Sequence, residues 1–170
     1  FKLLDNKFSG EQRLWTNKRK NFSIMLPQAW HPKEEVGGNI KQMFISRERL
    51  RTANDIFQVG VTVTEISSFS KLIGRRVESE RDIIKIWYGA LEEVSQQMPT
   101  VIYGFQEIKG ENKNGIIFER SYMQDSFIQE YHVILAKGDT VYDVVLEAPV
   151  MEFEIYRDLF LKAIESIKLR

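Results

Sequence analysis

The regular pattern of the chain begins with two short runs in which apolar and polar residues alternate. These runs, Leu14 to Thr16 and Phe22 to Leu26, lie on either side of the polar turn 17–21. A period of two on both sides of a short turn predicts a β-hairpin. Pro27 ends its second strand because proline has no N–H for the ladder. Residues 1–13 show no clear period and are predicted to form an N-terminal arm or extension.

A loop and two more strands are predicted next. The polar stretch from His31 to Asn39 contains two successive glycines, which predicts a loop. Strands are predicted over 41–46 and 56–66, joined by a loop over 47–55. The second strand carries three valines at alternate positions, which is typical of a half-buried strand.

A long amphipathic helix is predicted to begin after Ser79 and to end at Pro99. Its apolar residues recur at the spacing of one helical face: Ile83, Trp87, Ala90, Leu91, Val94 and Met98. Within 67–81, a short helical turn is indicated by three further apolar residues, Phe69, Leu72 and Ile73.

Four strands in close succession are predicted to form an antiparallel meander because their links are short: 100–108, 116–123, 127–136 and 140–148. The last two are apolar on both faces, as in strands that are covered on both sides. Pro149 introduces a final helix whose apolar stripe runs from Phe153 to Ile167. The predicted fold class is α+β, an α/β/α sandwich with a central, mostly antiparallel sheet covered by helices on both faces.

The composition fits one globular domain: the chain has 170 residues, of which 43% are hydrophobic and 28% charged. Its 24 basic and 24 acidic residues cancel, so no overall field draws it to nucleic acid or anionic lipid. The absence of cysteine excludes disulfides, thiolate metal sites and a cysteine nucleophile. No apolar run in the sequence approaches the length of a membrane span.

The chain begins with Phe1, and its first methionine is Met25. Because translation starts at methionine, this sequence is expected to be a processed or trimmed product. Two explanations stay open. A signal peptide, with or without a lipid-anchor cysteine, preceded Phe1, or the chain was trimmed for another reason.

Three local features resemble PsbP-like domains. Trp15, the polar turn and the run Phe22 to Trp30 match an opening of the form aromatic, turn, F-S-hydrophobic-x-hydrophobic-P-x-x-W. The strand Val141 to Pro149 and the helix after it resemble the closing part of that family, and the helix with Trp87 lies where the family has one. The resemblance covers about residues 14–168 and implies an arm over 1–13 followed by a single PsbP-like domain over 14–170.

The resemblance also bears on function. The superfamily includes an extrinsic photosystem subunit, a Ran-binding import factor and bacterial envelope lipoproteins of the DcrB kind, and its common thread is binding or assembly without catalysis. Fold alone does not transfer function. We expect a non-catalytic binding or assembly module, exported or lipid-anchored in the cell envelope, with a protein partner and with membrane contact only through such an anchor. A cytosolic protein-binding adaptor, and hence a cytoplasmic location, stays open as an alternative.

No catalytic, cofactor-binding or metal-binding residues are predicted, and no cofactor is expected. His31 and His132 are the only histidines, and neither has a second ligand at metal-binding spacing. The chain has no P-loop, G-x-G-x-x-G or G-x-S-x-G motif. The alternative is a hydrolase-type enzyme that uses His132 with carboxylates assembled by the fold. Convergence of His132 with two acids in an open cleft would favour it, and packing of His132 under a helix would disfavour it.

Two small groups of residues are candidates for partner binding. Arg47, Arg49 and Arg51 lie in a predicted loop and could contact an anionic partner, although solvated loop charges are the simpler interpretation. Phe69 and Leu72 would form an apolar contact patch if both were exposed; packing inside the domain is the alternative.

Overall fold

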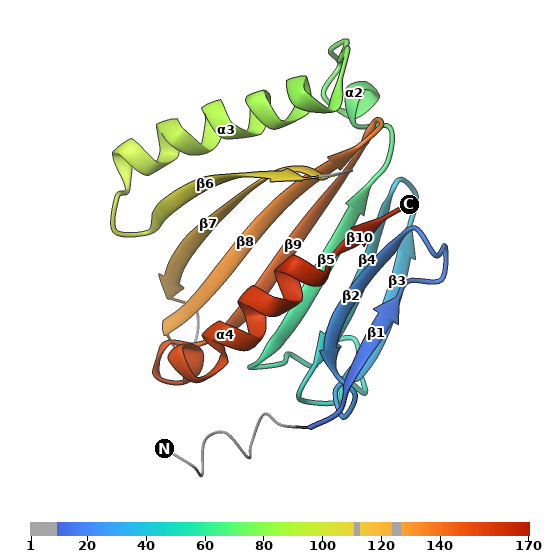
Figure 1. Cartoon of the computed structure of the whole chain (residues 1–170), viewed down its shortest axis with the longest axis vertical. Coiled ribbons are helices and arrows are strands. Elements are labelled where there is room, and N and C mark those ends of the chain that lie inside the picture. The colour runs from blue at the N-terminus through green and yellow to red at the C-terminus, as the bar shows by residue number, and fades with distance from the viewer. Residues whose placement is uncertain (1–9, 111–112, 124–126) are drawn as a thin grey trace.

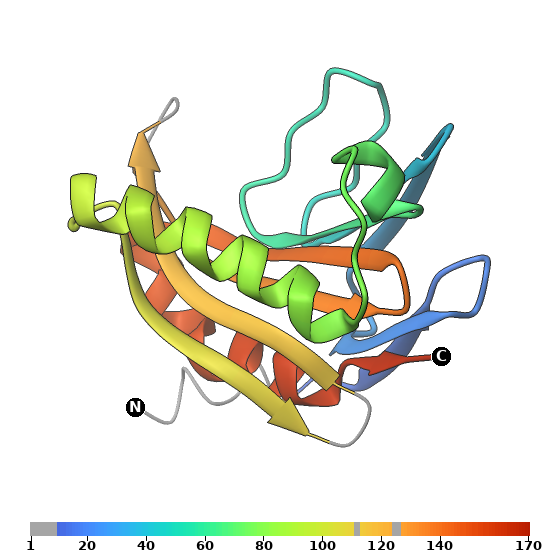
Figure 2. The ribbon, with the colours of Figure 1, turned by 90° about the horizontal axis from the view of Figure 1, so that it is seen from above.

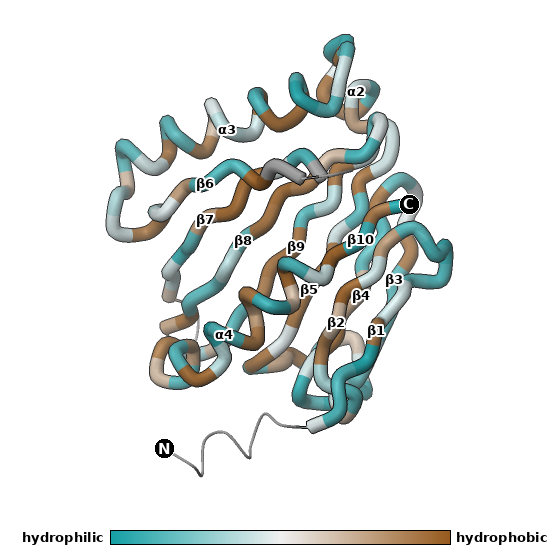
Figure 3. Tube along the Cα trace, viewed as in Figure 1, coloured by the Kyte–Doolittle hydropathy of each residue, from teal (hydrophilic) through white to brown (hydrophobic). Residues whose placement is uncertain are grey.

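The computed structural model describes residues 10–110, 113–123 and 127–170. Two antiparallel sheets make up most of the fold (Figure 1). The larger has seven strands in the order β3-β4-β5-β9-β8-β7-β6, and the smaller has three in the order β1-β2-β10. Apolar residues follow the central strands, and polar residues gather at the turns (Figure 3).

The larger sheet consists of β3 (His31–Gly37), β4 (Ile40–Ser46), β5 (Gly60–Ile66), β6 (Ile102–Gly110), β7 (Lys113–Met123), β8 (Phe127–Lys137) and β9 (Thr140–Pro149). The smaller consists of β1 (Gln12–Thr16), β2 (Phe22–Pro27) and β10 (Lys168–Leu169). The helices are α2 (Phe69–Leu72), α3 (Glu80–Gln97) and α4 (Val150–Ser166). The predicted hairpin, both long helices, the short helical turn and the four-strand meander are confirmed.

The prediction of a loop over residues 31–39 is wrong, because most of this stretch is the strand β3. β3 lies at the edge of the larger sheet and pairs only with β4 among the described strands. An edge strand tolerates the proline at position 32 and keeps polar side chains in solvent. Gly37 ends β3 and pairs with Ile40, while Gly38 lies in the hairpin turn and adopts a φ of 56°.

Two further boundaries differ from the sequence pattern. β5 starts at Gly60, so residues 56–59 extend the loop that follows β4. β1 starts at Gln12, inside the range predicted as an arm, while residues 1–9 of that range lie outside the described part of the chain.

The hairpin of β1 and β2 lies over the larger sheet and is closed by the C-terminus. β10 pairs with β2 through Leu169 and Phe22. The buried carboxylate of Glu65 on β5 accepts hydrogen bonds from Arg19 (2.8 Å) and Asn21 (3.0 Å) in the hairpin turn. The small sheet is thus tied to the larger one by both apolar packing and a buried polar anchor.

Each face of the larger sheet packs against its own core. On one face, α4 contacts β8 and β9 and shares the cover with β2. On the other, α3 packs on β6, β7 and β8 (Figure 2). The α+β class, the antiparallel sheet and a helix on each face are as predicted. The simple sandwich is confirmed only in part, because a small second sheet completes the layer of α4.

Candidate functional site

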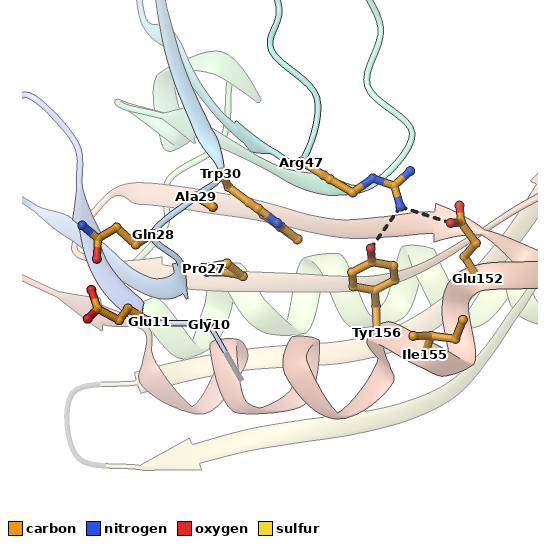
Figure 4. A pocket seen from close by; sticks show the side chains of 10 residues that line it. All are labelled: Gly10, Glu11, Pro27, Gln28, Ala29, Trp30, Arg47, Glu152, Ile155 and Tyr156. Atoms are coloured by element: carbon orange, nitrogen blue, oxygen red, sulfur yellow. Dashed lines mark hydrogen bonds and ion pairs between the residues drawn. The ribbon is translucent and has the colours of Figure 1, made fainter. Parts of the chain in front are cut away.

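A pocket of about 860 Å³ lies between the turn after β2 and the first turns of α4 (Figure 4). Its walls come from four separate stretches of the chain: Gly10 and Glu11, Pro27 to Trp30, Arg47, and the α4 residues Glu152, Ile155 and Tyr156. Pockets of this size are typical of sites for small ligands or short peptide segments.

The turn after β2 forms one wall of the pocket. The N–H of Trp30 donates to the carbonyl of Pro27 (3.1 Å), and the N–H of Gln28 donates to the carbonyl of Glu11 (2.8 Å). These bonds turn the chain back so that the Trp30 ring enters the core, where it lies 6.3 Å from the ring of Tyr156. Both aromatic side chains are only 7% exposed, so they form a fixed apolar floor.

Arg47 forms the opposite wall and is held by three partners. Its guanidinium donates to the Tyr156 hydroxyl (3.0 Å) and pairs with the carboxylates of Glu152 (3.1 Å) and Glu48 (2.7 Å). Burial works against the charge, but the hydrogen bonds outweigh it and hold the pKa of Arg47 above its usual range. The guanidinium is therefore permanently charged and fixed in place.

The other predicted contact residues lie elsewhere. Arg49 and Arg51 are exposed on the loop after β4 and do not line the pocket. Phe69 is 4% exposed and stacks on Trp87, which places it in the core rather than in a surface patch. Leu72 is exposed by 59%. The proposed groups therefore separate, and only Arg47 reaches the pocket.

A second polar cluster lies on the face of the larger sheet that α3 partly covers. His132 on β8 contacts Asp143 through Nε2, and its Nδ1 lies 3.6 Å from a carboxylate oxygen of Glu130. Its ring packs on Phe118 at a centroid distance of 4.7 Å. Burial alone would lower the pKa of His132, but the hydrogen bond to Asp143 and the nearby Glu130 outweigh it and raise the pKa to about 9.

Glu147 on β9 continues this cluster. It lies directly opposite Glu130 in the ladder of β8 and β9 and accepts a hydrogen bond from the Tyr122 hydroxyl (2.9 Å). Burial, together with the charge of Glu130, raises the pKa of Glu147 to about 7 despite the Tyr122 hydrogen bond. Arg120 lies 3.6 Å from Glu130 and supplies a counter-charge.

The fold thus brings His132 together with two acids, as the hydrolase alternative requires. The geometry does not favour that alternative, because Nε2 is engaged by Asp143, Nδ1 is buried and forms no hydrogen bond within the described residues, and the side chain is only 14% exposed. A general base needs a free nitrogen within reach of a substrate proton. Among the described residues, no group of three or more histidines and acids has the arrangement of a metal site.

Sequence reasoning missed the pocket but had a signal for the polar cluster. The predicted antiparallel pairing of the strands over 127–136 and 140–148 brings Glu130 and Glu147 near each other, and the observed register places them directly opposite. For the pocket, the sequence offered two signs: Arg47, predicted as a partner contact, and Trp30, a tryptophan between two prolines.

Comparison with known proteins bears on the fold. No family model and no curated protein matches the chain. The solution structure of cyanobacterial PsbP (CyanoP) from Synechocystis sp. PCC 6803 superimposes with a TM-score of 0.60 over 95% of this chain and 94% of that one, at 8% identity. The chain has a PsbP-like fold.

Two further solved structures are similar to this PsbP-like chain. A crystal structure from Bacteroides thetaiotaomicron matches with a TM-score of 0.51 over 95% of this chain and 48% of that one, at 9% identity. A Pseudomonas aeruginosa protein of unknown function, described as a candidate regulator, matches with the same TM-score and identity over 95% of this chain and 99% of its own. At such identities these likenesses concern the fold alone. In the described part of the chain, no helix is long and apolar enough to cross a membrane.

Proposed function

We propose that this PsbP-like domain is a non-catalytic binding or assembly module whose pocket receives a short segment of a partner protein. The observation that carries the proposal is the pocket itself, which has an aromatic floor of Trp30 and Tyr156 and a fixed polar wall at Arg47. A concave apolar site with a few fixed polar groups is the usual form of a binding site.

The pocket is preorganised, which supports binding over a purely structural role. Trp30 and Tyr156 are held by core packing, and Arg47 is held by its three partners, so a ligand need not order them. Fixed side chains reduce the entropic cost of association. Aromatic and arginine side chains in such positions are also those that contribute most to binding at protein interfaces.

We further propose that the protein works outside the cytoplasm, exported or lipid-anchored. The PsbP-like fold and the resemblance of the opening hairpin to that family support this location. The full reading frame tests it: a signal segment ahead of Phe1 is expected, and a cytosolic N-terminal domain or a plain cytosolic start would overturn it.

The binding role can be tested by filling the pocket. Ala29 is exposed and lines the pocket, so Ala29→Trp should block it without disturbing the core. Ala53 is an exposed alanine of the loop after β4 that does not line the pocket, so Ala53→Trp is the matched control. Suitable probes are three capped tripeptides, Leu-Lys-Phe, Leu-Gln-Phe and Leu-Glu-Phe, titrated into the full chain labelled for amide NMR.

At least one tripeptide is expected to shift the amides of Trp30, Arg47 and Tyr156 together and saturably. Ala29→Trp should abolish these shifts, and Ala53→Trp should leave them unchanged. If no tripeptide moves the pocket amides, or if both variants behave alike, the pocket is not the binding site and the proposal fails.

A further inference from the structure

We infer that the segment received by the pocket carries a basic group, a lysine or arginine side chain beside apolar residues. This inference rests on the proposed binding function of the pocket and adds the chemical class of its partner. It follows from the balance of charged side chains around the pocket and from how each of them is already engaged.

The one cationic side chain among the pocket residues is already neutralised. Arg47 directs its NH1 group at Glu152 and at Tyr156, and its Nε and NH2 groups at Glu48. A ligand carboxylate or phosphate would have to displace these partners. Since an anion gains little from a guanidinium whose donors face other carboxylates, the presence of Arg47 does not make this an anion site.

The acidic side chains, in contrast, have capacity left. Glu11 and Glu152 both line the pocket, so two carboxylates stand against one guanidinium. Within the described residues, the Glu11 side chain has no hydrogen bond or ion pair. Glu152 contacts Arg47 and keeps about a third of its surface exposed. This surplus of acidic side chains around the pocket favours a cation over an anion in the incoming segment.

The aromatic floor of the pocket also favours a cationic group. The faces of Trp and Tyr rings attract cations. Arg47 already lies over the Tyr156 ring, with its guanidinium carbon 5.8 Å from the centroid. Glu11 lies beside Gln28 and directs its carboxylate away from Trp30 and Tyr156 (Figure 4), so a second basic group would meet this carboxylate at the edge of the pocket. Apolar side chains of the same segment would fill the space between Pro27 and Ile155.

The three tripeptides test the charge preference directly. At low salt and neutral pH, Leu-Lys-Phe should bind about threefold to tenfold more tightly than Leu-Glu-Phe, with the neutral Leu-Gln-Phe between them. Added salt should reduce this preference because the charges lie near solvent. Glu11→Gln should reduce it as well, while Glu92→Gln, at an exposed carboxylate on α3, should not.

A failure of the proposed charge preference and a failure of the proposed binding role give different results. If the acidic or neutral peptide shifts the pocket amides at concentrations equal to or below those needed for the basic one, the basic partner is excluded while the binding role stands. If Glu11→Gln and Glu92→Gln have equal effects, the attraction does not come from the pocket and the inference is overturned. If none of the peptides moves the pocket amides, the proposed function itself falls.

Discussion

Two side chains of the polar cluster on β8 and β9 make the stability of the protein dependent on pH. The pKa of Glu147 is raised from 4.5 to about 7, and that of His132 from 6.5 to about 9. In both cases the folded state binds a proton more tightly than the unfolded state. Stability therefore falls as pH rises, from pH 4.5 to 7 through Glu147 and from pH 6.5 to 9 through His132.

We expect the free energy of unfolding to decrease by a few kcal/mol between about pH 5 and pH 9, given about 1.4 kcal/mol per unit of pKa shift. Glu147→Gln should remove most of the decrease below pH 7 and leave that above it. Urea unfolding at a series of pH values measures both. Glu92→Gln is the control, since its carboxylate is exposed. A profile that rises over this range, or one unchanged in Glu147→Gln, would contradict the assignment.

Single residues also show where sequence reasoning stops. The short link between β8 and β9 indicated that the two strands pair, but the register that places Glu130 opposite Glu147 is known only from the structure. The engagement of Arg47 was not predictable, because its partners are a neighbouring residue and two side chains more than 100 positions away. A cluster of arginines in a sequence suggests an anion site, and only the positions of the carboxylates decide whether it is one.

At the scale of elements, Gly115 and Gly89 are expected to respond in opposite ways to substitution by alanine. Gly115 on β7 lies so close to β8 that an added Cβ would come within 2.5 Å of the Ile134 carbonyl oxygen and of the Leu135 side chain. Gly89 is exposed on α3 and has nothing within 4 Å of that position. Substitution by alanine should therefore lower the stability of the protein at Gly115 and raise it at Gly89.

Gly115→Ala is expected to destabilise the protein by about 1–3 kcal/mol through overpacking. Gly89→Ala is expected to stabilise it by up to about 1 kcal/mol, because alanine is the better helix former. Thermal unfolding of the two variants beside the unmodified protein is the measurement. Equal effects of the two substitutions would contradict the close contact between β7 and β8.

Elements with a strong hydrophobic period were predictable from the sequence, whereas β3, which has no such period, was not. The stripe of α3 and the alternation in β5 reflect burial of one face, which the sequence records directly. β3 buries little, and its residues are polar except for Pro32, Val36 and Gly37, so its pattern matches a loop. Its strand conformation comes from pairing with β4, which is a tertiary effect.

At the scale of the whole molecule, the C-terminus closes the N-terminal hairpin. Leu169 on β10 is buried between β2 and the core, while the neighbouring Lys168 is exposed. Ser166 adds a second link, since its hydroxyl accepts a hydrogen bond from the N–H of Met25 (2.8 Å). The C-terminal residues and the N-terminal hairpin therefore stabilise each other.

Leu169→Ala should cost about 2–3 kcal/mol, at the lower end of buried leucine truncations. Lys168→Ala should stay within about 0.5 kcal/mol of the unmodified protein. Amide hydrogen exchange should show faster exchange in β1 and β2 for Leu169→Ala than for Lys168→Ala. Unchanged protection of β2 would mean that β10 does not hold the hairpin.

The fold class could be predicted from the sequence, but the arrangement of the layers could be predicted only in part. The order of strands and helices indicated an antiparallel sheet with a helix on each face, and the PsbP-like fold bears this out. That the first hairpin forms a separate sheet with a strand of two residues was not predictable, because two residues carry no period. The pocket depends on this layer, since the turn after β2 is one of its walls.

The pairing of β2 with β10 also joins two strands that are made at very different times during synthesis. β2 ends at Pro27 and its partner β10 begins at Lys168, so most of the domain separates the two strands along the chain. At about 5–20 residues per second, the intervening chain takes roughly 7–30 s to appear. During that time, the apolar side chains of β1 and β2 lack the cover that α4 and β10 later provide, so the unfinished domain exposes them. A chain that ends at Ser166 should accordingly have a less protease-resistant hairpin than one that ends at Arg170.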